Sequence, residues 1–457
     1  MGLVSGHIKL VIWLVFVVSA MWNIAGAQTV CGDWSGKLRV GERQLRLVIH
    51  ASQDSVIMDS PDQGSYGIVG EDVYVADDSI SFRVPRIMMS YAGRRENDTI
   101  SGIFQQMGMK VPLSFVRGVN KVERPQTPVP PFPYISEEVT IENEEGGAVL
   151  AGTLCIPANA TVETPVAVLV SGSGLQNRDE ELFEHKPFAV IADYLARNGI
   201  ASLRYDDRGF GKSKGNGFNA TTADFASDAQ AAVDWLRSQG RFGKIGIIGH
   251  SEGGQIAYML GAKEDGPDFI VSVAGPVVKG TKTIAYQNKV ALMKSGVSQR
   301  QAEDFAAAVE RMLEYKLKAD FEPVPEDKAE EVVTEIYPQR NDDASTAQLA
   351  ATLKNALMPK GDNTWMMCFL GYDPGVDVKK LKVPAFIIYG EKDRQVPPSL
   401  NLDLARSLTP EAKVECYPGL NHLMQHAVTG NVEEYSSITE TFSPQLLKDI
   451  ADFIQSL

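Results

Sequence analysis

Short apolar segments alternate with helical segments through the middle of the chain, and this alternation constrains the fold more than any other feature. The apolar segments are mostly apolar on both faces, and the sequences between them repeat apolar residues at the spacing of an amphipathic helix. Such strands are typical of a sheet that helices cover on both sides, so we expect an α/β domain with a mostly parallel sheet. The expected strands are residues 166–170, 200–205, 245–248 and 269–274, and the expected helices between them are residues 188–198 and 223–239.

The alternation is interrupted between about residues 278 and 373, where the pattern is helical. An all-helical insert within a parallel sheet is interpreted as a lid. Its expected helices are residues 299–319, 327–335 and 346–356. A hairpin precedes the alternating region and further strands follow the insert, at residues 137–141, 149–156, 385–389 and 414–417. Ser443 and Pro444 are expected to begin a final helix.

Residues 1–27 have the pattern of a cleavable signal peptide. Lys9 precedes an apolar run at residues 10–20, and Ala25-Gly26-Ala27 then supplies the small residues of a cleavage site. The apolar run is too short to cross a bilayer comfortably. We therefore expect cleavage after Ala27 and a secreted or periplasmic protein without an integral membrane span. An uncleaved membrane anchor is the alternative.

Residues 28–120 are interpreted as a separate all-β domain. Short segments such as residues 45–50 and 79–84 alternate apolar and polar side chains, and turn-forming residues lie between such segments. The opening Gly32-Asp33-Trp34 is similar to the start of small lipocalin-like barrels, so we expect a barrel or a sandwich. We expect side chains to fill the interior of this domain, which then has a structural or docking role. The alternative is an interior that holds a ligand.

A proline-rich linker at residues 121–134 is expected to separate this domain from residues 135–457. Proline fixes φ and lacks a backbone N–H, so a segment rich in proline favours neither a helix nor a sheet ladder. The prolines are Pro125, Pro128, Pro130, Pro131 and Pro133.

Composition and charge exclude several classes of function. The formal net charge is −14 and no basic segment is concentrated enough for a nucleic-acid partner. The 4 cysteines are scattered, with no C-x-x-C spacing, which argues against a zinc site. The glycines of residues 205–213 lack the spacing of a phosphate loop, and we interpret Asp206 and Arg208 there as an ion pair. We expect no metal and no other cofactor.

The strongest chemical motif is Gly249-His250-Ser251-Glu252-Gly253, which directly follows the expected strand at residues 245–248. A serine on a sharp turn between a strand and a helix projects its hydroxyl above the sheet, and small residues on either side let the backbone approach closely. Ser251 is therefore the predicted nucleophile.

A serine hydroxyl needs a base to take its proton, and histidine is the usual one. The chain has 6 histidines. His7, His50, His185 and His250 are set aside by their positions, because the base follows the nucleophile in this kind of fold. His422, in a loop after an expected strand, is the predicted base, and His426 is the alternative.

The acid that orients the base is expected at the end of the strand between the nucleophile and the histidine. The strand at residues 385–389 is followed by Gly390-Glu391-Lys392-Asp393. Asp393 is the predicted acid, with Glu391 as the competitor. A helix-capping role for Asp393 is the structural alternative.

Two backbone N–H groups are expected to hold the oxyanion. One is that of Glu252, at the start of the helix that follows the nucleophile. The other comes from the loop after the strand at residues 166–170, where Gly174 and Leu175 are both candidates.

These motifs together resemble bacterial α/β-hydrolases of the EstD-like esterase group, which is related to dienelactone hydrolases and prolyl-oligopeptidase-like hydrolases. The resemblance covers roughly residues 135–457 and implies an α/β-hydrolase fold with a lid insert after an N-terminal extension. It also implies a triad of Ser251, Asp393 and His422. The motifs that carry it are Ser171-Gly172-Ser173-Gly174, Asp207-Arg208-Gly209, Gly249-His250-Ser251-Glu252-Gly253-Gly254, Gly390-x-x-Asp393 and Gly419-x-Asn421-His422.

The expected function is that of a serine carboxylesterase (EC 3.1.1 type) acting on small-molecule esters with short-to-medium acyl groups. Two alternatives stay open. One is a serine peptidase or aminopeptidase of the same fold, since the same triad cleaves amides. The other is a catalytically inactive protein that binds a ligand. The apolar run Trp365-Met366-Met367 of the lid is a candidate lining for the acyl pocket, and lid core is the alternative.

Overall fold

The computed structural model describes residues 29–40, 43–63, 65–106, 108–119, 122–338, 344–361 and 364–457. The expected signal peptide and its cleavage site at Ala27 lie outside these residues. The chain divides into two compact units, one made mainly of the residues up to Val119 and the other mainly of Asn120–Leu457. In the described ranges, no helix has both the length and the apolar character needed to cross a membrane.

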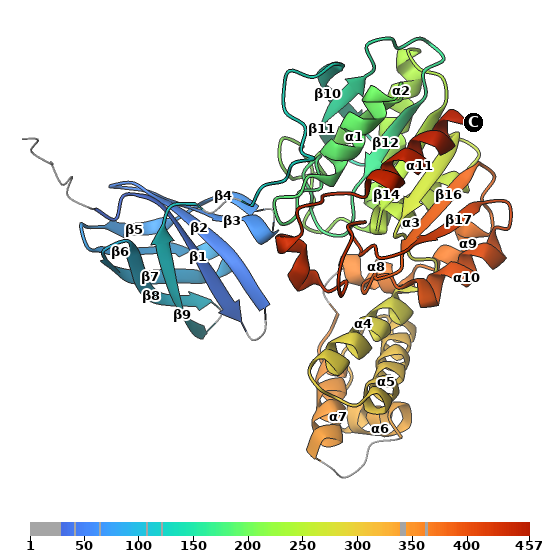
Figure 1. The fold of residues 1–457 in the computed structure, drawn as a ribbon. Coiled ribbons are helices and arrows are strands. Elements are labelled where there is room, and N and C mark those ends of the chain that lie inside the picture. Colours follow the sequence, from blue (N-terminus) through green and yellow to red (C-terminus); the bar gives the residue numbers. More distant parts are fainter. Residues whose placement is uncertain are drawn as a thin grey trace, which may run out of the picture. The chain divides into compact units, whose positions relative to one another are not determined.

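The N-terminal unit is an antiparallel β-structure (Figure 1). Its described residues form a nine-stranded sheet in the order β4-β3-β2-β1-β9-β8-β7-β6-β5. The two strands at the ends of this order are neighbours in sequence, so the sheet nearly closes into a barrel. The predicted all-β domain is therefore confirmed, with a barrel-like form. The strands are β1 Gly32–Val40, β2 Arg43–Ala51, β3 Val56–Ser60, β4 Ser65–Val69, β5 Glu71–Val75, β6 Ser79–Val84, β7 Met89–Glu96, β8 Thr99–Gln106 and β9 Met109–Arg117.

Apolar side chains fill the interior of this sheet. Trp34 is fully buried, and its indole N–H donates to the carbonyl of Val30 at 2.7 Å. The guanidinium of Arg117 lies 4.1 Å from the centre of the Trp34 ring, and the rings of Tyr91 and Phe115 pack edge to face at 5.1 Å. Trp34, the tryptophan of the opening motif, is thus part of the hydrophobic core of this unit.

The C-terminal unit is built on an eight-stranded sheet of described residues in the order β10-β11-β13-β12-β14-β15-β16-β17. The pairs β10/β11 and β11/β13 are antiparallel and the remaining pairs are parallel. This confirms the predicted mostly parallel sheet preceded by a hairpin. The strands are β10 Ile135–Asn143, β11 Ala148–Ile156, β12 Val166–Val170, β13 Ala201–Tyr205, β14 Ile245–His250, β15 Phe269–Val273, β16 Ala385–Gly390 and β17 Lys413–Tyr417.

Helices cover both faces of this sheet (Figure 1). One core cluster joins the sheet to α1 (Pro187–Arg197) and α11 (Pro444–Gln455). The other cluster joins the opposite face to four helices. These are α2 Thr222–Gln239, α3 Glu252–Gly261, α9 Pro374–Val378 and α10 Pro398–Leu408. Burial on both faces explains why the central strands are apolar throughout.

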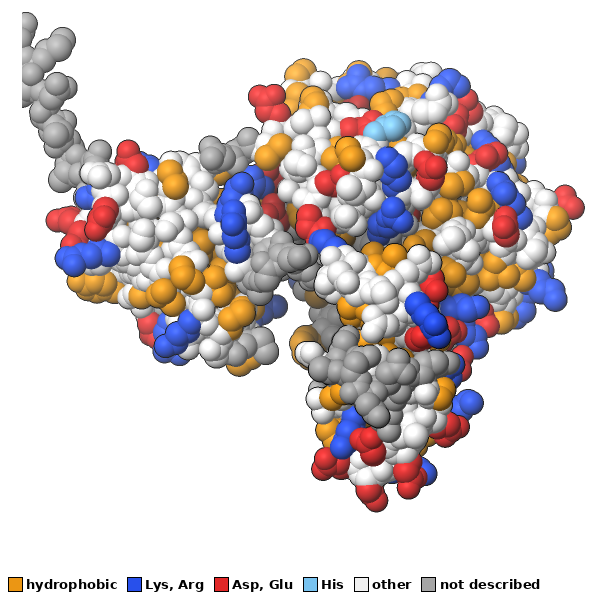
Figure 2. All heavy atoms as spheres, turned by 60° about the horizontal axis from the view of Figure 1, so that its bottom comes forward, with side chains coloured by type: hydrophobic (Ala, Val, Ile, Leu, Met, Phe, Trp, Pro, Cys, Tyr) orange, Lys and Arg blue, Asp and Glu red, His pale blue; other side chains and the backbone are white. Residues whose placement is uncertain are grey.

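A helical insert lies between β15 and β16 and has a core of its own, which includes Phe305, Val332 and Leu353. Its helices are α4 Gly280–Lys294, α5 Gln299–Lys318, α6 Glu326–Ile336, α7 Ala344–Leu357 and α8 Thr364–Gly371. Helices α5, α6 and α7 match the expected ones, whereas α4 and α8 were not expected. Acidic and basic side chains are interspersed on the surface of the insert and of the rest of the unit (Figure 2).

Candidate active site

Ser251 lies on a strained turn between β14 and α3. Its φ of 53° and ψ of −113° are rare for a residue with a side chain. The turn is held because the Ser251 N–H donates to the carbonyl of Val273 at 2.8 Å and its own carbonyl accepts from Gly254 N–H at 3.0 Å. The hydroxyl therefore sits at the carboxyl end of a central strand.

Close packing explains the glycines on either side of this serine. A Cβ atom at Gly249 would overlap the carbonyl of Gly253, and a Cβ atom at Gly253 would overlap the carbonyl of Val170. Either substitution would force backbone apart at the turn. The small residues expected beside the predicted nucleophile are thus needed for the approach of β14, α3 and β12.

His422 and Asp393 come from the loops after β17 and β16, and His422 lies between Ser251 and Asp393 with a hydrogen bond to each. The Nε2 atom of His422 lies 3.1 Å from Ser251 Oγ, and its Nδ1 atom lies 2.8 Å from Asp393 Oδ2. The Asp393 and His422 side chains are buried, with residue exposures of 1% and 4%. The structure brings the three residues together in the order serine, histidine, aspartate.

The other carboxylate oxygen of Asp393 fixes the orientation of the side chain. Its Oδ1 atom accepts from the backbone N–H groups of Gln395 and Val396, both at 2.8 Å. Only Oδ2 is left to face His422, so it accepts from Nδ1–H. The Nε2 atom is then free to accept the hydroxyl proton of Ser251.

The alternative acid and base lie elsewhere among the described residues. Glu391 accepts from the N–H of Gly419 at 2.8 Å, and the exposed His426 pairs with Glu440 at 2.9 Å. His185 is buried, and burial lowers its pKa to about 4. These side chains do not contact Ser251.

The loop after β12 lies against the start of α3. Glu252 is the first residue of that helix, so its N–H has no acceptor within the helix. Within the described residues, the N–H groups of Gly174 and Leu175 also have no hydrogen-bond acceptor in the protein. Gly174 lines the same small cavity as Glu252, whereas the Leu175 side chain packs against Gly217.

The side chain of Glu252 has a role that the sequence analysis missed. Its buried carboxylate accepts from the Thr222 hydroxyl at 2.5 Å and from the indole N–H of Trp365, in α8, at 2.8 Å. Burial raises the pKa of Glu252, and the hydrogen bonds from Thr222, Trp365 and Ser173 lower it by less. Through Trp365, the helical insert is attached directly beside Ser251.

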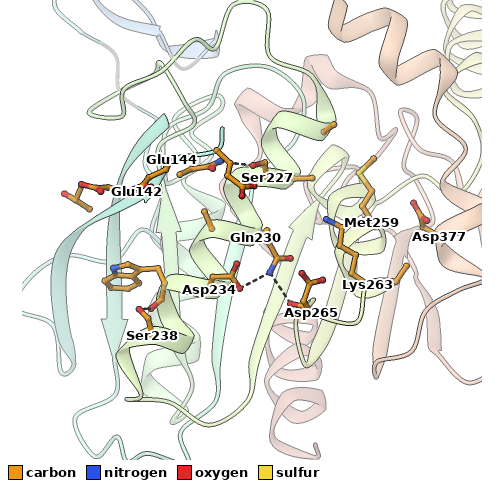
Figure 3. Close-up of a pocket in the computed structure, with 18 of the residues that line it drawn as sticks. Glu142, Glu144, Ser227, Gln230, Asp234, Ser238, Met259, Lys263, Asp265 and Asp377 are labelled. Atoms are coloured by element: carbon orange, nitrogen blue, oxygen red, sulfur yellow. Dashed lines mark hydrogen bonds between the residues drawn. The ribbon is translucent and has the colours of Figure 1, made fainter. Parts of the chain in front are cut away.

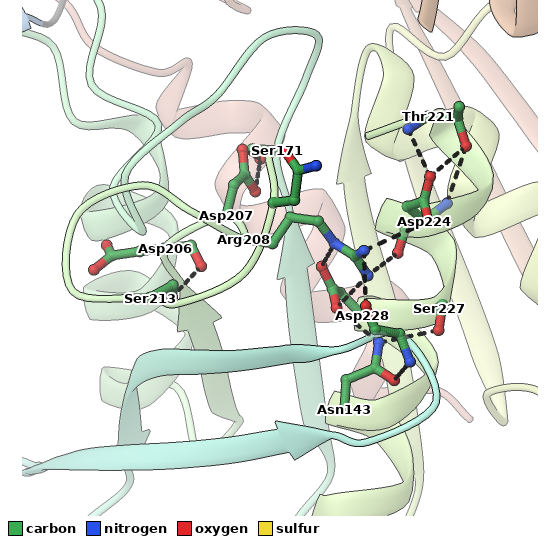
Figure 4. A network of polar contacts seen from close by, with 12 residues as sticks. Asn143, Ser171, Asp206, Asp207, Arg208, Ser213, Thr221, Asp224, Ser227 and Asp228 are labelled. Carbon is green, nitrogen blue, oxygen red and sulfur yellow. Dashed lines mark hydrogen bonds and ion pairs between the residues drawn. The ribbon is translucent and has the colours of Figure 1, made fainter. Parts of the chain in front are cut away.

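The expected ion pair between Asp206 and Arg208 is wrong. Arg208 pairs instead with Asp228, in α2, with Nε–Oδ2 at 2.7 Å (Figure 4). Asp206 pairs with Arg178, with Oδ2–Nη2 at 3.0 Å. The backbone turns between the two residues, so their side chains lie on opposite sides of the loop. Both residues nevertheless have the structural role that we expected for them.

A groove of about 1220 Å³ lies outside this site (Figure 3). It runs along the outer side of α2, where Gln230 donates to Asp234 at 3.0 Å and to the carbonyl of Asp265 at 3.1 Å. The described residues that line it do not include Ser251, His422 or Asp393. Across the described part of the chain, no group of three or more His, Cys, Asp or Glu side chains is placed to hold a metal ion.

Comparisons with known proteins agree with this fold. A model of the α/β hydrolase fold family matches residues 174–427. Esterase EstD of Thermotoga maritima is 24% identical over 300 residues, which are 65% of this chain and 61% of EstD. The match therefore spans less than two thirds of that relative's length.

The chain is also similar to solved structures. The Pyrococcus furiosus esterase Pf2001 is 14% identical with a TM-score of 0.42, over 74% of this chain and 99% of the other. Est1E from Butyrivibrio proteoclasticus is 15% identical with a TM-score of 0.42, over 70% of this chain and 98% of the other.

Proposed function

Because the chain belongs to the α/β-hydrolase fold family, we propose that it is a serine carboxylesterase with Ser251 as its nucleophile. The observation that supports this most strongly is the continuous series of hydrogen bonds from Ser251 Oγ through His422 to Asp393. A serine hydroxyl with a base and an oriented acid is the arrangement that acyl transfer requires.

The proposed reaction has two steps. Ser251 Oγ attacks the ester carbonyl carbon while His422 Nε2 takes the hydroxyl proton. The bond to the alcohol oxygen then breaks, His422 gives its proton to that oxygen, and the acyl group stays on Ser251. Water attacks the acyl-enzyme in the same way, and its proton passes through His422 to Ser251 Oγ as the acid leaves.

The oxyanion of each tetrahedral intermediate is proposed to accept from the N–H of Glu252 and from one N–H of the loop after β12. The absence of a protein acceptor for the N–H groups of Gly174 and Leu175, among the described residues, supports this assignment. Gly174 is the better candidate of the two, because it lines the small cavity beside Glu252. Donors that are already oriented stabilise the charge as it develops.

The proposed substrates are small esters with short-to-medium acyl groups. The hydrogen bond between Trp365 and Glu252 holds α8 of the insert beside the nucleophile, and the Trp365 ring stacks on Phe369 at 5.2 Å. An insert anchored this close to the reacting serine restricts the length of the acyl group. A secreted or periplasmic location after cleavage at Ala27 is proposed from the N-terminal sequence alone.

We expect kcat/KM for p-nitrophenyl esters to be highest for short-to-medium acyl groups and to fall for long ones. The test is a series of acyl-chain lengths, run beside aminoacyl p-nitroanilides on the same protein. Cleavage of the anilides within about tenfold of the best ester, which is about 1.4 kcal/mol in transition-state stabilisation, would favour a peptidase instead. A maximum at long chains would contradict the proposed restriction by the insert.

A further inference from the structure

A second histidine lies beside the proposed triad and is absent from its mechanism. His250 directly precedes Ser251, and its residue exposure is 7%. Its Nδ1 atom lies 2.8 Å from Glu180 Oε1, and its Nε2 atom lies 2.9 Å from the backbone carbonyl oxygen of His422. The ring centres of His250 and His422 are 4.9 Å apart. His250 therefore contacts the backbone of the proposed base rather than the reacting hydroxyl.

Glu180 connects the same pair to the loop that follows β12. Its exposure is 2%, and the Oε1 atom that faces His250 also accepts from the N–H of Gly172 at 2.7 Å. Gly172 lies against the nucleophile, because a Cβ atom placed on it would be 3.2 Å from Ser251 Cβ. One buried carboxylate oxygen thus joins the loop of the proposed oxyanion donors to the loop of the proposed base.

The hydrogen-bond partners fix where the protons are. A carbonyl oxygen only accepts, so Nε2 of His250 carries a hydrogen, and a second proton must lie between Nδ1 and Glu180 Oε1. Burial lowers the pKa of His250, but the charge and hydrogen bond of Glu180 and the carbonyl of His422 outweigh it, and the pKa is raised overall. Glu180 and His250 therefore share one proton, and both contacts of the imidazole depend on it.

We infer that Glu180 and His250 are positioning residues for the proposed esterase reaction, on which this inference rests. His422 is a loop residue, and its reach to Ser251 depends on where its backbone is held. The hydrogen bond from His250 fixes the His422 carbonyl, and the bond from Gly172 to Glu180 fixes the other loop. A displacement of about 1 Å at a reacting group costs about 10²-fold in rate.

Two conservative changes test the pair. In Glu180→Gln, one of the three contacts is lost. An amide oxygen in the place of Oε1 keeps Gly172 but takes the hydrogen of neutral His250 to Nδ1 and away from the His422 carbonyl, whereas an amide N–H in that place donates to Nδ1 but cannot accept from Gly172. In His250→Asn, the amide reaches only as far as Nδ1, so the contact with His422 is lost. We expect each variant to lower kcat by about 10²-fold with little change in KM, since the substrate itself is not contacted.

His250→Gln separates positioning from a purely structural role. A glutamine amide reaches as far as Nε2 and can still donate to the His422 carbonyl, so this variant is expected to retain more kcat than His250→Asn at similar thermal stability. Matched controls are Glu181→Gln, one residue from Glu180, and His426→Gln, whose exposed side chain pairs with Glu440. Both controls are expected to keep wild-type kcat.

The measurement is steady-state kinetics on a short acyl ester, with active sites counted by a fluorophosphonate so that unfolded protein is excluded. Equal kcat in Glu180→Gln, His250→Asn and the controls would overturn the inference. It would also be overturned if the loss of kcat across all the variants were proportional to their loss of thermal stability. A wild-type protein that neither hydrolyses the ester nor reacts with the fluorophosphonate would instead refute the proposed function.

Discussion

Replacing Ser251 by alanine is expected to lower kcat for short acyl esters by about 10⁶-fold. The change removes only the Oγ atom, which lies 3.1 Å from His422 Nε2 and is the atom that forms the acyl-enzyme. The backbone bonds that hold the turn, from Ser251 N–H to Val273 and from Gly254 N–H to Ser251, do not use the hydroxyl. The fold is therefore expected to survive, and thermal unfolding beside the kinetics checks this.

Ser407→Ala is a matched control for this variant, because Ser407 is an exposed residue of α10 whose hydroxyl donates to the Leu404 carbonyl of its own helix at 2.8 Å. It is expected to have wild-type kcat. Retention of wild-type activity by Ser251→Ala would refute Ser251 as the nucleophile.

Replacing Asp393 by asparagine is expected to lower kcat by about 10⁴-fold while the local geometry is kept. The N–H groups of Gln395 and Val396 both donate to Oδ1, so the single oxygen of an asparagine will take that position. Its amide then faces His422 Nδ1 and donates to it. Nδ1 becomes an acceptor, Nε2 carries the hydrogen, and His422 can no longer accept the proton of Ser251.

Steady-state kinetics on the same ester measures this effect, and NMR of the His422 ring hydrogens reports the tautomer. Asp403→Asn, on the exposed surface of α10, is the control and is expected to leave kcat unchanged. An Asp393→Asn protein with wild-type kcat would show that another group orients His422.

The sequence predicted most of the α/β sheet because both faces of its strands are buried, which gives short apolar runs between amphipathic helices. The helices α4 and α8 were missed for local reasons. The α8 sequence is apolar almost all round and has no amphipathic stripe, and α4 has two threonines in its first turn and little separation of polar from apolar residues. The other helices of the insert, α5, α6 and α7, follow the expected pattern.

The position of each proposed triad residue could be inferred from the order in which this kind of fold places its nucleophile, acid and base. The contacts that support the triad residues could not be inferred from the sequence. Glu180 lies 70 residues from His250, and His250 lies 172 residues from His422, so no local pattern relates them. The same holds for Arg208, which pairs across 20 residues with Asp228 rather than with its near neighbour Asp206.

The most direct test of the central claim is labelling of the wild-type protein with a fluorophosphonate, followed by mass spectrometry of its peptides. This reagent reacts with a serine whose hydroxyl is activated by a base. We predict one adduct per chain, on Ser251, and its loss in both Ser251→Ala and His422→Ala. An unlabelled wild-type protein, or an adduct on a different serine, would contradict the account.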